Sequence, residues 1–174
     1  MKYQKLSNIF ITGGGGYLGS VLVPLLLNQG YHVRVLDRFL FGKKTLASCS
    51  NNKNCALIEG DARWYSKQLL QGMDGVIDLA ALANDSLGEL DPERTLNKNY
   101  RARLRTATLA KEAGVKKYIL ASSCSVYGFR AGILTETADV APKTTYAKAN
   151  VLAEKAVLLL NDNNFTVTVL RQGT

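Results

Sequence analysis

In this 174-residue chain, the first segment whose residue types and spacing suggest a chemical role is rich in glycine. Residues 12–19 read TGGGGYLG, so Gly14, Gly16 and Gly19 fit the spacing G-x-G-x-x-G, and Gly13, Gly16 and Gly19 fit G-x-x-G-x-x-G. Glycine permits the positive φ of a tight turn and lets backbone approach a pyrophosphate closely. A helix that begins near Gly16 would add free N–H groups and the positive end of its dipole. The segment therefore predicts a loop that binds the phosphates of a dinucleotide.

An acidic residue at the end of the next predicted strand extends this prediction. Asp37 follows Gly19 by eighteen positions and is placed to accept hydrogen bonds from an adenosine ribose. Its charge would repel a ribose 2′-phosphate, whereas Arg38 beside it could pair with that phosphate. The sequence favours NAD as the cofactor and leaves NADP open.

Alternating strand-like and helix-like segments must position these residues. Strands are predicted over residues 7–12, 31–37, 56–61, 75–81, 117–122 and 165–170, and helices over residues 16–29, 64–71, 91–112 and 144–161. Pro24 is expected to kink the first helix or to remove one of its hydrogen bonds, and Asp91 is expected to cap the third. The strands are nearly continuous in apolar residues, as strands buried on both faces are. The alternation predicts an α/β protein with a doubly wound parallel sheet, a Rossmann fold, in a single domain over residues 1–174.

Composition narrows the function classes further. No apolar stretch approaches the roughly 20 residues of a membrane span, and the first residues lack the apolar segment of a signal peptide, so we expect a cytoplasmic protein without a membrane partner. The cysteines, Cys49, Cys55 and Cys124, form no C-x-x-C pair, and His32 is the one histidine. This pattern predicts neither a disulfide framework nor a metal site.

Basic residues contribute to a formal net charge of +8 and crowd one stretch of the chain. They are Arg94, Lys98, Arg101, Arg103, Arg105, Lys111, Lys116 and Lys117. Such residues could neutralise nucleic-acid phosphates, but no run of stacking aromatic residues is interleaved with them. A solvated helix face is therefore favoured over a nucleic-acid partner.

Further motifs follow the glycine loop in a definite order. They are Asp61-Ala62, Leu79-Ala80-Ala81, Asn99 within the long helix, the SSCSVYG stretch of residues 122–128, and Tyr146. Together with residues 12–19, this order resembles the NAD-dependent epimerase/dehydratase branch of the extended short-chain dehydrogenase/reductase family, from about residue 7 to the last residue.

The resemblance implies a role for each motif. Gly13, Gly14, Gly16, Tyr17, Leu18 and Gly19 correspond to the cofactor loop, Asp61 and Ala62 to the adenine contact, and Leu79, Ala80 and Ala81 to the strand end beside the cofactor. Asn99 corresponds to a structural asparagine near the cofactor. Ser123 corresponds to the catalytic serine or threonine, and Tyr146 to the catalytic tyrosine, which also contacts the cofactor.

Asn150 departs from the family pattern, which places a lysine four residues after the tyrosine. Residues i and i+4 share a helix face, so a lysine there lowers the pKa of the tyrosine from about 10 toward neutral pH. Asparagine could still hydrogen-bond a ribose hydroxyl, but it carries no charge, and Lys148 points to another side of the helix. Asn150 is therefore expected to impair catalysis.

A second departure concerns the Asp-Glu pair of the family's dehydratases. Cys124 and Ser125 stand at those positions, so oxidation–reduction or epimerisation is favoured over dehydration. The relatives also continue into a smaller domain that holds the substrate, usually a nucleotide sugar. We expect this chain to be incomplete relative to the family, either as a shortened form or as a natural remnant.

These observations leave three functions open. The first is a nucleotide-sugar epimerase or oxidoreductase in which Tyr146 is the acid/base and Ser123 orients the substrate hydroxyl, with activity impaired by Asn150. The second is a non-catalytic NAD-binding module. The third is an atypical reductase that acts on another small molecule without a second domain. A homodimer is compatible with each.

Overall fold

The strands of the described chain form one parallel sheet with helices on both of its faces. The computed structural model describes residues 6–83 and 85–173. The strands are β1 (Asn8–Thr12), β2 (His32–Asp37), β3 (Cys55–Glu59), β4 (Gly75–Asp78), β5 (Lys117–Ser123) and β6 (Thr166–Gln172). They are arranged in the order β3-β2-β1-β4-β5-β6, and every neighbouring pair is parallel. This arrangement confirms the predicted doubly wound α/β fold.

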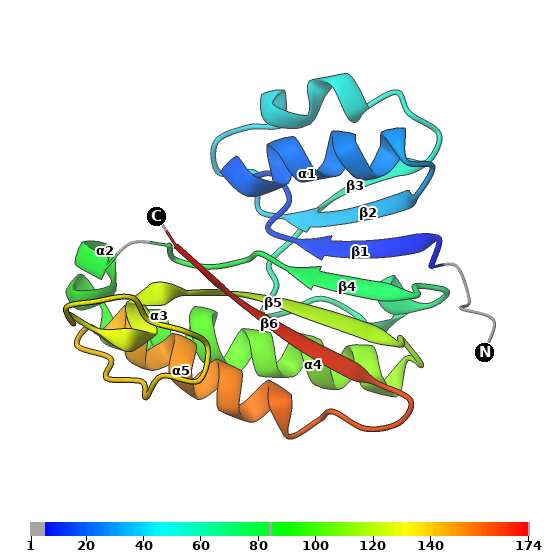
Figure 1. Cartoon of the computed structure of the whole chain (residues 1–174). Helices are drawn as coiled ribbons and strands as arrows, with labels where there is room; N and C mark the ends of the chain where they lie inside the picture. Colours follow the sequence, from blue (N-terminus) through cyan, green and yellow to red (C-terminus); the bar gives the residue numbers. More distant parts are fainter. Residues whose placement is uncertain (1–5, 84, 174) are drawn as a thin grey trace.

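The helices divide between the two faces of the sheet (Figure 1). Helix α1 (Tyr17–Asn28) covers one face, and α4 (Ala102–Glu112) and α5 (Thr145–Leu158) cover the other. Strand β1 packs against both layers because its side chains alternate. Phe10 belongs to the core beneath α4 and α5, whereas Ile9 and Ile11 belong to the core beneath α1. Burial of each such side chain stabilises the fold by about 1.5–3 kcal/mol, which anchors the strand that leads into the glycine loop.

All the carboxyl ends of the strands lie at the same edge of the sheet, where the arrowheads in Figure 1 point. In open parallel sheets, ligands bind in the crevice outside these ends, at the place where the strand order reverses. Here the reversal lies between β1 and β4, which are neighbours although β2 and β3 separate them along the chain. The sheet therefore brings the segments that follow β1, β2, β3, β4 and β5 to one edge.

Two of the predicted helices are wrong in detail. Residues 64–71 contain only a short 3-10 helix, η2 (Lys67–Leu70), whose N-terminus is capped by the Ser66 hydroxyl. The predicted helix over 91–112 consists of α3 (Pro92–Leu96), a π-helical turn η3 (Asn97–Arg101) and α4. Asp91 does cap it, since its carboxylate accepts the Arg94 N–H at 2.9 Å. A π turn widens the helix by one residue and commonly accompanies a functional site.

Helix α1 continues without interruption through Pro24. Proline lacks one N–H, but the buried Gly19, Val23 and Leu27 keep the helix packed on the sheet. Three short elements had no counterpart in the predictions: η1 (Lys44–Cys49), α2 (Asp85–Leu90) and η4 (Cys124–Tyr127). Strand β4 also ends at Asp78, so residues 79–81 belong to the following loop.

Candidate functional site

At two positions in the loop after β1, the surrounding atoms are so close that only glycine fits. Gly13 has a φ of 71°, and a Cβ atom there would lie 2.6 Å from the Ala80 nitrogen in the loop after β4. A Cβ atom at Gly19 would lie 2.1 Å from the Gly14 carbonyl oxygen. Because no side chain fits at either position, the glycine spacing fixes how the loop packs on α1 and on the neighbouring strand end.

Gly16 differs from these two glycines, because the space around it is open. It is the N-cap residue of α1, and a Cβ atom there would contact only the Gly13 carbonyl oxygen, at 3.3 Å. No side chain caps the helix, and its first turn carries no acidic residue. Tyr17 and Leu18 in this turn are exposed to 87% and 44%. The helix therefore presents uncapped N–H groups and its positive dipole end at an accessible place, which fits a pyrophosphate.

Asp37 ties the glycine loop to the end of β2. Its Oδ2 accepts the N–H of Gly15 at 2.9 Å, and its Oδ1 accepts the N–H of Phe39 at 2.7 Å. A carboxylate oxygen has two lone pairs, so each oxygen can accept a further hydrogen bond, including one from a ribose hydroxyl. The structure thus gives Asp37 a role in shaping the loop in addition to the predicted role in binding ribose.

Charged residues from the segments after β2 and β3 form a group. Arg63 forms a bidentate ion pair with Asp61, through Nε to Oδ1 at 3.0 Å and through Nη2 to Oδ2 at 2.8 Å. Arg38 lies 3.7 Å from the same carboxylate. The hydrogen bonds from Arg63 lower the pKa of Asp61 to about 2. Asp61 is therefore ionised at neutral pH and is held in place beside the partly buried Ala62.

The loop after β4 lies against the glycine loop. The N–H groups of Leu79 and Ala80 donate to the carbonyl and the hydroxyl of Thr12, at 3.0 and 3.3 Å, and Ala81 follows them. Asn99 in the π turn is fully buried and exchanges two hydrogen bonds with the backbone of Leu82, at 2.8 and 2.9 Å. The side chain of Asn99 therefore fixes the π turn to this loop.

Below this loop lies a buried carboxylate that the sequence did not single out. Asp78 accepts the hydroxyls of Thr12 at 2.5 Å and of Tyr118 at 2.6 Å, and it is 1% exposed. Burial raises the pKa of Asp78, and the positive charge of Arg103 opposes that rise. A polar residue at the end of an otherwise apolar strand is the signal that points to it.

Ser123 and Tyr146 lie on neighbouring elements of the same edge, and both side chains are partly exposed. Ser123 ends β5, and its hydroxyl accepts the Ser125 N–H at 3.2 Å. Tyr146 is in the first turn of α5, which packs against η4 and α2. Thr144 caps this helix, and the Glu89 carboxylate of α2 accepts the Thr145 N–H at 2.5 Å. The start of α5 is therefore well fixed beside the end of β5.

Asn150 lies on the inward face of α5 and is fully buried. Its Oδ1 accepts a hydrogen bond from Nη1 of Arg103 at 2.5 Å, and its Nδ2 donates to the Tyr146 carbonyl at 3.1 Å. Both ends of the amide are engaged inside the protein, and the side chain does not reach solvent at the open edge. The structure therefore joins Asn150 to α4, whereas the sequence suggested a contact with a ribose hydroxyl.

The interpretation of the basic stretch as a solvated helix face is wrong for Arg103, which is 2% exposed. Arg103 and Asn99 are four positions apart in the same helical segment and both are buried. That spacing is the signal that could have separated Arg103 from its exposed neighbours, because residues i and i+4 share a helix face.

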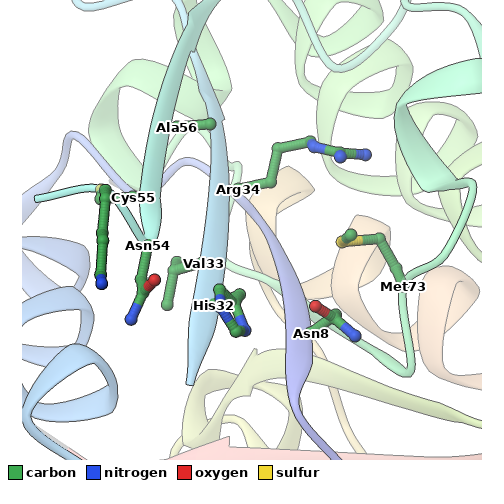
Figure 2. A pocket seen from close by; sticks show the side chains of 9 residues that line it. Asn8, His32, Val33, Arg34, Asn54, Cys55, Ala56 and Met73 are labelled. Carbon is green, nitrogen blue, oxygen red and sulfur yellow. The ribbon is translucent and has the colours of Figure 1, made fainter. Parts of the chain in front are cut away.

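The opposite edge of the sheet carries a different feature, a depression of about 250 Å³ (Figure 2). Its lining residues include Asn8, His32, Arg34, Asn54 and Met73, at or near the amino ends of the first three strands and in the turn before β4. It is therefore remote from the glycine loop. Over the part of the chain that the structure describes, no three histidine, cysteine or acidic side chains gather as a metal site would require. Within the same residues, every helix is too short or too polar to cross a membrane.

Comparisons with known proteins identify the family of this chain. Residues 9–174 match the NAD-dependent epimerase/dehydratase family. UDP-glucuronic acid decarboxylase 4 of Arabidopsis thaliana is 32% identical over 72% of this chain, which spans 28% of that enzyme. The UDP-N-acetylglucosamine 4-epimerase of Methanobrevibacter ruminantium, solved with UDP-N-acetylmuramic acid, superposes on 97% of this chain with a TM-score of 0.89 and 28% identity.

A further solved structure is the UDP-glucuronic acid 4-epimerase of Bacillus cereus in complex with NAD. It covers 96% of this chain with a TM-score of 0.88 and 26% identity. The chain spans 55% and 57% of the two epimerases. The motif order, the strand order and the match over residues 9–174 lead to one conclusion: the chain belongs to the NAD-dependent epimerase/dehydratase family.

Proposed function

We propose that this chain binds NAD at the carboxyl edge of its sheet and forms the cofactor-binding part of a nucleotide-sugar epimerase or oxidoreductase. The observation that carries the proposal is the glycine loop, which is held on one side by the Ala80 backbone and on the other by Asp37. It leaves open space and an uncapped helix start at Gly16. The solved B. cereus relative was crystallised with NAD, which supports this choice of cofactor.

Different residues around the loop would bind different parts of NAD. The first turn of α1 would hold the pyrophosphate, and Asp37 would accept a ribose hydroxyl with its remaining lone pairs. Asp61 and Ala62 would line the adenine side, and residues 79–81 with Asn99 would support the cofactor from β4. Tyr146 would contact the nicotinamide end.

For catalysis, Tyr146 would exchange a proton with a substrate hydroxyl, and the Ser123 hydroxyl would orient that hydroxyl by a hydrogen bond. NAD, when bound, supplies a reversible acceptor for hydride. The substrate class that we propose is a nucleotide sugar, because the three relatives described above are named for UDP-sugars. The chain spans only part of each relative, so we propose that residues 1–174 act as a single nucleotide-binding domain within that activity.

A second candidate is a module that binds NAD without turning over a substrate. The observation that favours it is that a buried, uncharged residue, Asn150, lies one helical turn after Tyr146. A neutral side chain there does not itself stabilise a tyrosinate. The two candidates share the cofactor site and differ in whether Tyr146 acts as an acid and base on a substrate.

Calorimetric titration of the 174-residue chain with NAD and with NADP tests the shared part of the proposal. We expect saturable binding of NAD that is tighter than that of NADP. An assay with UDP-sugars, which follows NADH absorbance and epimerised product, then separates the enzyme from the binding module. The failure of both dinucleotides to bind a folded chain would contradict the proposed function.

A further inference from the structure

The depression at the amino edge of the sheet gathers hydrogen-bond donors. Its lining includes the basic side chains of Arg34 and Lys53, the imidazole of His32, and the amides of Asn8 and Asn54 (Figure 2). Among the described residues that line it, none is an aspartate or a glutamate. A concave surface that offers positive charge and N–H groups in this way attracts an anion.

The register of the sheet brings these donors to one face. Asn8 of β1 is the partner of His32 of β2, and Asn54 directly precedes β3. Side chains alternate along a strand, so Arg34 points to the same face as His32. Phe10, the register partner of Arg34, belongs to the core beneath α4 and α5. The depression therefore lies on that face, beyond the amino end of its core.

A short connection leaves this part of the face accessible. In the described chain, the segment between β3 and β4 carries one helical element, η2, which is 4 residues long. A longer helix there would cover more of the strand ends. Ala56, the register partner of Arg34, is exposed and contributes only a methyl group. Small side chains and a short η2 therefore keep the depression open.

Arg34 is held in place without being neutralised. Its Nη1 donates to the Leu69 carbonyl of η2 at 2.5 Å, which uses one of the five N–H bonds of the guanidinium. Over the part of the chain that the structure describes, no carboxylate lies within 4.0 Å of the charged nitrogens of Arg34 or Lys53. The remaining donors of Arg34 are therefore available to a ligand.

One carboxylate, that of Asp74, does lie beside the depression. Its Oδ2 accepts the backbone N–H groups of Ser7 and Asn8, both at 2.9 Å, and one N–H of the Asn8 amide at 3.2 Å. These hydrogen bonds hold the carboxylate against β1. Two cationic side chains, Arg34 and Lys53, face this single negative charge, so the balance in and around the depression stays positive.

The size of the depression and its donors together select a small oxyanion. Its volume of about 250 Å³ is below the roughly 300–1,000 Å³ of pockets that enclose a drug-sized ligand. An arginine fork and an ammonium group can donate to several oxygens of one phosphate, whereas a carboxylate offers only two oxygens. The donor set therefore fits a phosphate group better than a carboxylate.

We propose that this depression is a second ligand site, which binds a phosphate group at the edge of the sheet opposite the glycine loop. Arg34 and Lys53 supply the positive charge, and His32, Asn8 and Asn54 supply further N–H donors. The site goes beyond the proposed function and does not depend on the binding of NAD.

NMR titration of the ¹⁵N-labelled chain with inorganic phosphate tests the site, with sodium chloride at the same ionic strength as the reference. We expect saturable shifts of the amide signals of residues 32–34 and 53–56, with a dissociation constant of about 10 mM or below. Shifts at residues 13–17 would report phosphate at the proposed cofactor site, and excess NAD should remove only these. If NAD does not bind, the proposed function fails and the signals of residues 32–34 still test the second site.

Charge-removing variants locate the binding. Lys53→Gln should weaken phosphate binding at least about threefold and Arg34→Gln at least about fivefold, because each removes a cation next to the ligand. Lys155→Gln, an exposed change of equal charge on α5, is the control and should bind like the wild type. The amide spectrum of Arg34→Gln shows whether it folds without its bond to Leu69.

A parallel titration with glycerol 3-phosphate separates two sources of the ligand. Similar affinity would show that the depression accepts a phosphate group on a larger molecule, and much weaker binding would show that it selects the free ion. The proposal is overturned if the wild-type signals respond to phosphate only as they respond to chloride. It is also overturned if Lys53→Gln and folded Arg34→Gln both bind phosphate like Lys155→Gln. Should Arg34→Gln not fold, Lys53→Gln alone decides.

Discussion

At the residue scale, the glycines of the loop have separable roles, which two substitutions can distinguish. Gly16→Val adds a side chain into space that only the Gly13 carbonyl borders, so the fold should survive. The same side chain would occupy the place of the pyrophosphate, and we expect NAD affinity to fall at least about tenfold, or 1.4 kcal/mol. Calorimetry and a thermal melt of the same sample check both parts. Unchanged affinity would place the cofactor elsewhere.

Gly19→Ala is the matched contrast, because its Cβ atom would lie 2.1 Å from the Gly14 carbonyl oxygen. The backbone must shift to relieve this contact, and overpacking of this kind destabilises proteins by about 1–3 kcal/mol. We expect a lower urea midpoint with or without NAD. A variant as stable as the wild type would show that the loop and α1 can separate easily.

Asp37 should set the preference between the two dinucleotides. Asp37→Ala removes the charge that repels a ribose 2′-phosphate, and we expect the ratio of the NADP to the NAD dissociation constant to fall at least about tenfold. The variant should also bind NAD more weakly, because the N–H groups of Gly15 and Phe39 lose their acceptor. Titrations with both dinucleotides measure the ratio. A wild-type preference for NADP would assign the choice to Arg38 instead.

The sequence was informative about residues that form motifs and uninformative about residues that support them. Gly13, Gly16, Gly19, Asp37 and Tyr146 could be named because spacing along the chain marks them. Arg103 and Asp78 were not named, because the helix spacing and the strand pattern that mark them do not show what lies opposite them in the folded protein. Helical periodicity identifies a face, but only the packing of α4 on β5 and α5 shows that an arginine on that face is buried.

At the element scale, Asn99 joins the π turn to the loop that follows β4. Asn99→Leu removes both hydrogen bonds with Leu82 and leaves that backbone N–H and carbonyl without partners, which costs about 1–3 kcal/mol. We expect faster hydrogen exchange at the Leu82 amide and a lower urea midpoint. Asn97→Leu is the control in the same turn, because the partly buried Asn97 amide bonds the exposed side chains of Glu93 and Arg101 and not the loop after β4. Equal exchange rates in the two variants would show that Asn99 does not stabilise the loop.

Prediction of the elements from sequence succeeded where packing and pattern agree. All six strands were located to within about three residues at each end, since apolar β-branched runs are typical of strands covered on both faces. The π turn, α2 and the 3-10 helices η1 and η4 were missed. Each is only 4–6 residues long, too short to show a period, and depends on tertiary contacts such as the one between Glu89 and Thr145.

At the scale of the whole molecule, acid stability should depend on Asp61. Its pKa falls from 3.8 to about 2 on folding, so its ion pairs stabilise the folded state above about pH 4 and this contribution is lost as the pH falls toward 2. Since the carboxylate is partly solvated, we expect about 1 kcal/mol. Asp61→Asn should lower the free energy of unfolding at pH 6 and match the wild type near pH 2.

Urea unfolding at several pH values measures this difference. Asp78, whose raised pKa gives a pH dependence of opposite sign, is present in both proteins and cancels in the comparison. Glu59→Gln is a control, because Glu59 forms an exposed ion pair with Lys43. A constant gap between the wild type and Asp61→Asn from pH 6 to pH 2 would show that the effect is not electrostatic.

The position of β1 in the middle of the sheet has a consequence for how the chain acquires its structure. Of the six described strands, β1 is synthesised before the others; its partner β2 follows soon afterwards, but its other partner, β4, emerges only after β3. Parallel pairing always requires such delayed, non-local contacts, which slow folding. During synthesis the side of β1 that will pair with β4 is therefore unpaired for the time needed to make residues 38–78. A chaperone would be needed most during this interval.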